Sequence, residues 1–310
     1  CPLSPLLFAI VMTILMHDAK RNMTEHATAG VAPSNLLVNE LLYADDTLIV
    51  DVDAARAEQF MHCIGRAGSM YGLSFNWRKL EILSVRCEAK IAKPDGSYIA
   101  EKERLVYLGS LLSSDGLAGS ELNRRLGAAR GEFHTLAKVR SHAKLDTAKK
   151  LRIFDACVLS KLLYCLHTTW LNVAEQRKLN AFQARCLRNI VGVPHSYISR
   201  VSNQTVLEMA GCPKLSGILL KRQLFYMASI ARKPDDDVLR ECLFEPSSFQ
   251  LKQFSGKRKR GRPRVCWANE VFKHAVAIAG SQDSPGVSWQ NTAVAQAAWQ
   301  RAVHQYCASL

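Results

Sequence analysis

Residues 41–50 read "LLYADDTLIV", an apolar run that contains two adjacent carboxylates, Asp45 and Asp46. Like charges side by side repel each other, and an apolar setting makes both more costly. A β-hairpin would resolve the conflict, with strands at 40–43 and 47–50 packing their apolar side chains and the bend lifting both carboxylates into a cleft. Mg²⁺ would then offset the repulsion, because it prefers carboxylate oxygens. A solvent-exposed turn without a ligand is the alternative.

The sequence around this run predicts an α+β arrangement. Before it, an apolar stretch predicts a helix from Ser4 to about Lys20, with Ser4 as N-cap and Pro5 at the first helical position. This helix is apolar nearly all round, so we expect it to be buried. After the run, we expect a helix over 54–71 that ends at Gly72. The segments 79–85 and 104–113 each predict one further strand.

From residue 119 the apolar positions recur with a helical period. They predict three helices up to residue 192, with Asp146 capping the second and Asn172 and Glu175 forming a capping box for the third. We expect further helices at about 203–211 and 215–232. The segment "KRKRGRPR" (257–264) then predicts a basic linker before a short helical tail.

Charge is distributed unevenly along the chain. Residues 1–115 carry a net charge of −3, whereas residues 116–265 carry +17. This favours a metal-using chemical module joined to a module that binds a polyanion, although solvated faces of basic helices would give the same numbers. No apolar run reaches the roughly 20 residues that span a bilayer, and no Cys/His group has zinc-ligand spacing. We expect an intracellular protein without a membrane partner.

Six segments resemble, in order, the reverse transcriptase of non-LTR (LINE-type) retrotransposons. They are "CPLSPLLF" (motif B), "YADD" (motif C), "GLSFNWRKLEIL" (motif D), "YLGSLLSSDG" (motif E), the region of "CLRNIVGVPH" and "LLKRQLFYMASIARKPDDD" after the polymerase core, and "KRKRGRPRVCWANEV". The resemblance implies an α+β protein in four parts. These are a partial palm at 1–115, with an antiparallel sheet and packed helices, a helical thumb at 116–195, a helical extension at 196–254, and a basic linker with a short helical tail at 255–310.

The resemblance implies an RNA-directed DNA polymerase that extends a DNA primer on an RNA template, using deoxynucleoside triphosphates and two Mg²⁺ ions. Asp45 and Asp46 would bind these ions together with an upstream aspartate of motif A. Lys79 would be catalytic near the leaving pyrophosphate, although an ordinary surface lysine is the alternative. The residues expected at the nucleotide or the primer are Ser4, Pro5, Leu6, Tyr43, Tyr107, Leu108 and Gly109.

The basic thumb and linker would hold the nucleic-acid backbone through phosphate contacts. The residues expected to do so are Arg124, Arg125, Arg130, Lys149, Lys150, Arg152, Arg260, Arg262 and Arg264. The "GRP" of the linker also resembles an AT-hook, which lies in the minor groove of A·T-rich DNA. A nuclear-import signal and a plain basic linker are the other interpretations, and we expect a nuclear protein.

The sequence departs from the family at its start. The motif A aspartate and the fingers would precede Cys1 in this family, so we expect a truncated N-terminus and no polymerase activity from this chain alone. A non-catalytic nucleic-acid-binding remnant that uses the basic thumb and tail is therefore the main alternative. A phosphotransferase or nuclease that uses Asp45 and Asp46 is a third interpretation. The sequence gives no prediction for the oligomeric state.

Overall fold

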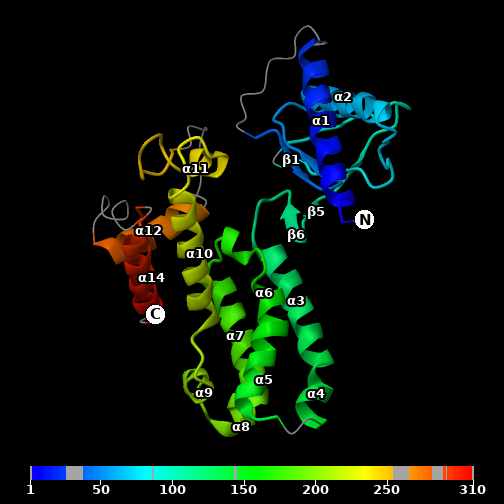
Figure 1. Ribbon diagram of the computed structural model, residues 1–310. Coiled ribbons are helices and arrows are strands. Elements are labelled where there is room, and N and C mark those ends of the chain that lie inside the picture. Colours follow the sequence, from blue (N-terminus) through cyan, green and yellow to red (C-terminus); the bar gives the residue numbers. More distant parts are fainter. Residues whose placement is uncertain are drawn as a thin grey trace. The chain divides into compact units, whose positions relative to one another are not determined.

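The computed structural model describes residues 2–25, 38–85, 87–142, 145–253, 265–280, 289–290 and 292–308. The chain divides into two compact units, Cys1–Leu117 (unit 1) and Ala118–Leu310 (unit 2) (Figure 1). Unit 1 mixes helices with short strands, and the described part of unit 2 is almost entirely helical. The predicted α+β class is therefore confirmed.

Unit 1 is built around a pair of packed helices and three short strand pairs. Its elements are α1 (Ser4–Glu25), β1 (Glu40–Tyr43), β2 (Asp46–Ile49), α2 (Ala54–Met70), β3 (Glu81–Ile82), β4 (Ala100–Glu101), β5 (Arg104–Tyr107) and β6 (Ser110–Ser113). Leu15 and Ala19 of α1 pack against Phe60, Ile64 and Ala67 of α2 and form the core of this unit. The predicted helix at 54–71 is confirmed to within one residue.

The strands of unit 1 form three separate two-stranded sheets. β1–β2 and β5–β6 are antiparallel, whereas β3–β4 is parallel. The single antiparallel sheet expected for a palm is therefore not present among the described residues. The segment 104–113, expected as one strand, is a hairpin instead, because Leu108 (φ 46°) and Gly109 (φ 75°) both adopt positive φ and reverse the chain.

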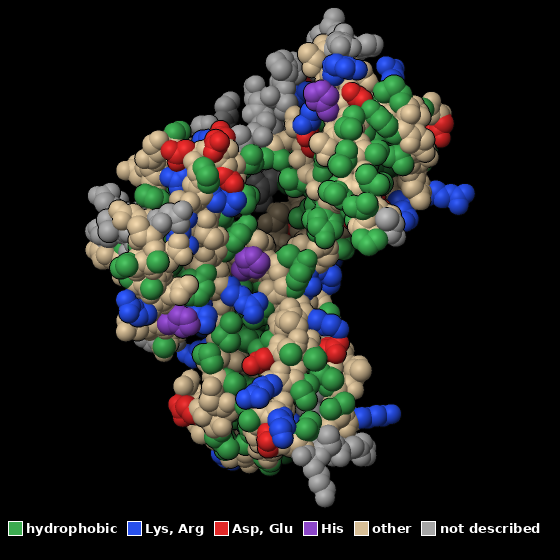
Figure 2. Space-filling model, in the orientation of Figure 1, with side chains coloured by type: hydrophobic (Ala, Val, Ile, Leu, Met, Phe, Trp, Pro, Cys, Tyr) green, Lys and Arg blue, Asp and Glu red, His purple; other side chains and the backbone are tan. Residues whose placement is uncertain are grey.

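The first helix differs from its prediction in three ways. The backbone N–H of Leu7 donates to the carbonyl of Leu3, so Leu3 rather than Ser4 is the N-cap. The helix also continues to Glu25, beyond the expected end near Lys20. Only Leu15, Met16 and Ala19 among its apolar residues are buried, because α2 covers only one side of the helix. Figure 2 shows apolar side chains gathered on the surface of unit 1.

Unit 2 contains the remaining described helices. They are α3 (Gly119–Thr135), α4 (Ala137–His142), α5 (Thr147–Ile153), the π-helical segment η1 (Phe154–Leu159), α6 (Ser160–Leu163), the 3₁₀ turn η2 (Leu166–Thr168), α7 (Val173–Val191), α8 (Ser196–Ser199), α9 (Asn203–Ala210), α10 (Leu215–Ala231), α11 (Val238–Leu243), α12 (Trp267–Ala279) and α14 (Ala293–Ala308). The Asp146 cap and the Asn172–Glu175 capping box are both confirmed. The two helices expected at 203–211 and 215–232 are also present as α9 and α10.

Unit 2 has two apolar cores that meet along α10. The first is formed by α3, α5 to α6, α7, α9 and the start of α10, with Leu122, Leu162 and Leu187 fully buried. The second is formed by the rest of α10 with α12 and α14, and it contains Trp289 and Trp299. Packing therefore continues across the expected boundary at 195/196. No helix within the described ranges combines the length and apolarity needed to cross a bilayer.

Candidate active site

The two carboxylates lie at the tip of the β1–β2 hairpin. Tyr43 pairs with Asp46 across the strands, so the loop consists of Ala44 and Asp45 alone. Ala44 adopts φ 54°, the positive value that type II′ hairpin turns require at this position. Both aspartates are exposed. The predicted hairpin is confirmed, with its second strand starting at Asp46 instead of residue 47.

The strands beside the tip are less buried than expected. Leu41, Leu42 and Tyr43 are exposed, whereas Ile49 packs against the α1–α2 core. The apolar flank on β1 therefore remains uncovered by the described residues. Lys20 of α1 forms an ion pair with Glu40 at the start of β1 and so links the strand to the helix.

The β5–β6 hairpin contacts the carboxylate hairpin through Tyr107. The phenol of Tyr107 donates a hydrogen bond of 3.1 Å to the carbonyl of Leu41. Burial raises the pKa of Tyr107, and the negative charge of Asp46 raises it further. Tyr107 was predicted at the primer, and the structure brings it beside Asp46. Leu108 and Gly109 form the turn that follows it.

A buried ion pair fixes the chain between β2 and α2. The carboxylate of Asp51 accepts hydrogen bonds from Arg56 Nε (2.8 Å) and from the backbone N–H of Asp53 (2.9 Å). Asp53 in turn caps α2 by accepting from the backbone of Ala55. Burial alone would raise the pKa of Asp51, but the hydrogen bond from Arg56 and the backbone contacts lower it overall. Sequence reasoning missed this pair, whose only signal was an acidic residue five positions before an arginine.

The hairpin offers an incomplete set of metal ligands. Mg²⁺ is commonly bound by one or two carboxylates together with substrate phosphates, so Asp45 and Asp46 fit a single ion. Two ions need more oxygen ligands than these. Within the described ranges, no group of three or more His, Cys, Asp or Glu side chains is placed to hold a metal ion. A further carboxylate would have to come from outside these residues.

The other residues predicted in unit 1 lie on different elements. Ser4, Pro5 and Leu6 form the exposed first turn of α1. Lys79 is exposed in the turn before β3, where its backbone N–H donates to the carbonyl of Asn76. No contact of Lys79 with the carboxylate hairpin is recorded in the described part of the chain. Its catalytic role stays a prediction.

Two of the arginines predicted to contact phosphates are bound to one glutamate. Glu121 is buried and accepts hydrogen bonds from Arg124 Nε (2.7 Å) and Arg125 Nε (2.6 Å). Burial would raise the pKa of Glu121, but the two guanidinium groups lower it overall. Arg125 is itself buried and lies 4.7 Å from the ring centroid of Tyr164. A phosphate would reach Arg125 only by breaking this ion pair.

The remaining predicted cations of unit 2 are more accessible. Arg130 and Arg152 are exposed, and Lys150 is half-buried. Lys149 is exposed and forms a 3.4 Å ion pair with Asp146. Arg260, Arg262 and Arg264 lie outside the described residues, so their expected role stays a prediction. Phosphate binding by the accessible side chains is likewise untested.

Comparison with known proteins identifies a relationship for unit 1 alone. Searches of curated proteins and of solved structures each gave no match. Residues 1–112 match the family model described as reverse transcriptase (RNA-dependent DNA polymerase). The matched range contains the carboxylate hairpin, the α1–α2 pair and nearly all of the β5–β6 hairpin. This part of the chain is therefore similar to the reverse transcriptase domain.

Proposed function

We propose that residues 1–112 belong to the palm of a non-LTR retrotransposon reverse transcriptase, an RNA-directed DNA polymerase. The observation that carries the proposal is the exposed Asp45–Asp46 pair at a hairpin tip, within a range that matches the reverse transcriptase family. The order of the motifs in the sequence supports the non-LTR type. The substrates would be an RNA template, a DNA primer and deoxynucleoside triphosphates.

In this proposal Asp45 and Asp46 hold Mg²⁺ at the primer end. Bound there, Mg²⁺ would activate the primer 3′ hydroxyl and neutralise the leaving phosphate oxygens. Tyr107 fixes the hairpin by its hydrogen bond to the backbone of β1. Tyr43, directly before the loop, is exposed and is available to contact the primer end. Lys79 would offset charge near the leaving pyrophosphate.

We further propose that the 310-residue chain is inactive without an additional carboxylate. The described residues supply two carboxylates for a chemistry that uses two metal ions. The test is incorporation of a labelled nucleotide by the purified chain on a primed RNA template, and we expect none. Incorporation that disappears in Asp45→Asn but persists in Asp95→Asn, an exposed turn carboxylate, would refute the inactivity.

Metal binding can be tested separately from activity. Electron paramagnetic resonance with Mn²⁺ as the probe would report weak binding to the whole chain. We expect Asp45→Asn and Asp46→Asn each to remove it, and Asp95→Asn to leave it unchanged. Equal binding in all four proteins would contradict the proposed role of the hairpin.

A second candidate is a non-catalytic protein that binds nucleic acid through unit 2. The exposed cations Lys149 and Arg152 on α5 favour it. Such a protein would lose affinity for duplexes of any sequence as salt increases. Substitution of Arg152 by Gln should then lower the slope of log affinity against log salt, whereas Asp45→Asn should not. Under both candidates we propose a nuclear location, on the basis of the basic segment 257–264.

A further inference from the structure

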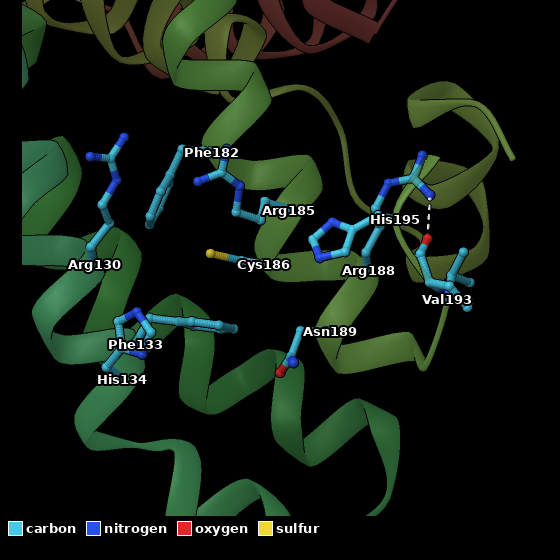
Figure 3. Close-up of a pocket in the computed structure, with 11 residues that line it drawn as sticks. Arg130, Phe133, His134, Phe182, Arg185, Cys186, Arg188, Asn189, Val193 and His195 are labelled. Atoms are coloured by element: carbon cyan, nitrogen blue, oxygen red, sulfur yellow. Dashed lines mark hydrogen bonds between the residues drawn. The ribbon is translucent and has the colours of Figure 1, made fainter. Parts of the chain in front are cut away.

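A cavity of about 390 Å³ lies within unit 2, lined by α3, α7 and the turn that follows α7 (Figure 3). Its lining includes three arginines, Arg130, Arg185 and Arg188, and no carboxylate. The size falls in the range of small-ligand pockets. A cavity whose charged lining groups are all cationic favours an anionic ligand.

Arg188 adds a buried cation to the lining, with its guanidinium turned towards the segment that follows α7 (Figure 3). This side chain is buried, yet all the acceptors of its guanidinium among the described residues are neutral. These are the carbonyls of Pro194 (3.1 Å) and Val201 (2.6 Å), Ser199 Oγ (3.4 Å) and Asn203 Oδ1 (3.0 Å). A buried charge without an opposite charge is costly, and a ligand phosphate nearby would lower that cost. Arg130 and Arg185 are exposed and add two further cations to the lining.

The cavity also has an apolar and aromatic wall. Phe133 of α3 and Phe182 of α7 line it, together with Cys186 of α7. In Figure 3 the side chains of Phe133 and Cys186 extend towards the middle of the cavity. Phe133 is half-buried and is held by an edge contact with Phe154 at 5.9 Å. A flat ring that enters the cavity would therefore meet aromatic carbon on one side.

A pair of stacked rings lies at the same end of α7. His195 lines the cavity and stacks on Tyr197, with ring centroids 5.8 Å apart and an interplanar angle of 8°. Tyr197 is 76% exposed, although exposed aromatic rings are costly in water. Aromatic side chains of this kind are stacking platforms for unpaired bases.

We propose that this cavity and the adjoining His195–Tyr197 stack bind single-stranded nucleic acid. One unpaired base enters the cavity against Phe133, and the neighbouring base stacks on Tyr197. The phosphates lie near Arg130 and Arg185, with the buried charge of Arg188 behind them. A duplex fits this site poorly, because its bases are paired and stacked inside the helix.

The proposal does not depend on the carboxylate hairpin or on polymerase activity. All of the residues that carry it belong to unit 2, whereas the family match covers only residues 1–112. A protein that never catalyses nucleotide transfer would still bind a single strand here. The two proposals therefore fail or succeed in different assays.

The test measures fluorescence anisotropy of labelled oligomers of about 12 nucleotides with the full chain, a length within the usual site size. The probes are oligo(dT), oligo(U) and an abasic oligomer of equal length and charge. Three double variants are compared with the parent: Arg130→Gln/Arg185→Gln, His195→Ala/Tyr197→Ala, and the control Arg177→Gln/Lys178→Gln. The control residues are exposed cations of α7 that do not line the cavity. Far-UV circular dichroism checks that each variant is folded.

We expect the parent to bind oligo(dT) or oligo(U) at least about tenfold more tightly than the abasic oligomer, the effect of stacking one or two bases. The Arg130/Arg185 variant should bind all three probes more weakly. It should also lower the slope of log affinity against log salt by about 1.4, because each charge contact with a single strand contributes about 0.7. The His195/Tyr197 variant should lose affinity only for the probes that carry bases, and its salt slope should equal that of the parent. The affinity of the control variant for each probe should stay within about twofold of the parent's affinity.

Two results would overturn the proposal. The first is equal affinity of the parent for the abasic oligomer and for both base-containing probes, since that shows no contact with bases. The second is an Arg130/Arg185 variant that behaves like the Arg177/Lys178 control, since the cavity would then contribute no more than any basic surface. A preference for oligo(U) over oligo(dT), or the reverse, supports the proposal and identifies RNA or DNA as the ligand.

Discussion

The N-terminus of α10 is capped by side chains from α7 instead of its own residues. Lys214, at the N-cap, makes no side-chain capping bond. Gln183 Oε1 accepts from the backbone N–H of Leu215 (2.9 Å), and Gln183 Nε2 donates to the carbonyl of Pro213 (2.8 Å). Asn180 binds the next residue in the same way, accepting from the backbone N–H of Ser216 (3.0 Å). We therefore predict that Gln183 contributes strongly to the stability of unit 2.

The perturbation is Gln183→Met, which keeps the length of the side chain and removes its amide. Gln183 is 1% exposed and Leu215 is fully buried, so water does not replace the lost partner. An unsatisfied buried polar group costs about 1–3 kcal/mol. Pro213 is exposed, so its carbonyl can bind water instead, and the loss expected from the Leu215 N–H is about 1–3 kcal/mol. A whole domain has only about 5–15 kcal/mol of stability.

The assay is urea unfolding followed by tryptophan fluorescence, because four of the five tryptophans lie in unit 2. Gln204→Met is the matched control, since Gln204 is exposed and donates only to Glu208. We expect the control to change stability by less than about 0.5 kcal/mol. A loss below about 0.5 kcal/mol in Gln183→Met, with an unchanged denaturant slope, would refute the capping argument.

Three further outcomes follow from the other polar contacts. The fold lowers the pKa of the Asp51 carboxyl from 3.8, so its contribution to stability is present above about pH 4 and is lost as the pH falls further. Asp51→Asn should therefore make the stability of unit 1, followed through Trp77 fluorescence, less dependent on pH in acid. Asp46→Asn should lower the pKa of Tyr107 in an ultraviolet titration, with Tyr107→Phe as the reference. An unchanged pKa would show that the charge of Asp46 does not act on Tyr107. Glu121→Leu removes the carboxylate that the buried Arg125 binds and should lower the free energy of unfolding in urea by about 3 kcal/mol. An unchanged free energy would show that Glu121 does not stabilise the fold.

Features that depend on neighbouring residues were predictable from the sequence. The carboxylate hairpin follows from apolar residues on both sides of an acidic bend, and the Asn172–Glu175 box follows from a spacing of three residues. Each of these is determined by the local chain, so a single sequence carries the signal. The family match covers the same stretch in which the hairpin was predicted.

Features that depend on distant partners were not predictable in the same way. Gln183 and Leu215 are far apart in sequence, and nothing in either segment indicates that they meet. The His195–Tyr197 stack and the cavity beside it likewise exist only once α3 and α7 pack together. The residue pattern over 104–113 predicted one strand, because a leucine rarely adopts positive φ and only the glycine after Leu108 indicated a turn. The resemblance to motif E, a primer-grip hairpin, had implied the hairpin.

The error over α1 shows what an apolar sequence does and does not specify. An all-apolar helix predicts burial, but burial requires a neighbour on every side, and α2 supplies one side only. Leu7, Ile10 and Ile14 follow one another at helical spacing and remain 45–57% exposed. The carboxylate hairpin of the same unit supplies two of the ligands that the proposed chemistry would use. A neighbour that is not among the described residues would supply both the cover and the remaining ligands, whereas unit 2 buries two apolar cores, and α7 and α9 have side-chain N-caps. Nucleic-acid binding by unit 2 is for this reason the property to measure first, because it needs no such neighbour.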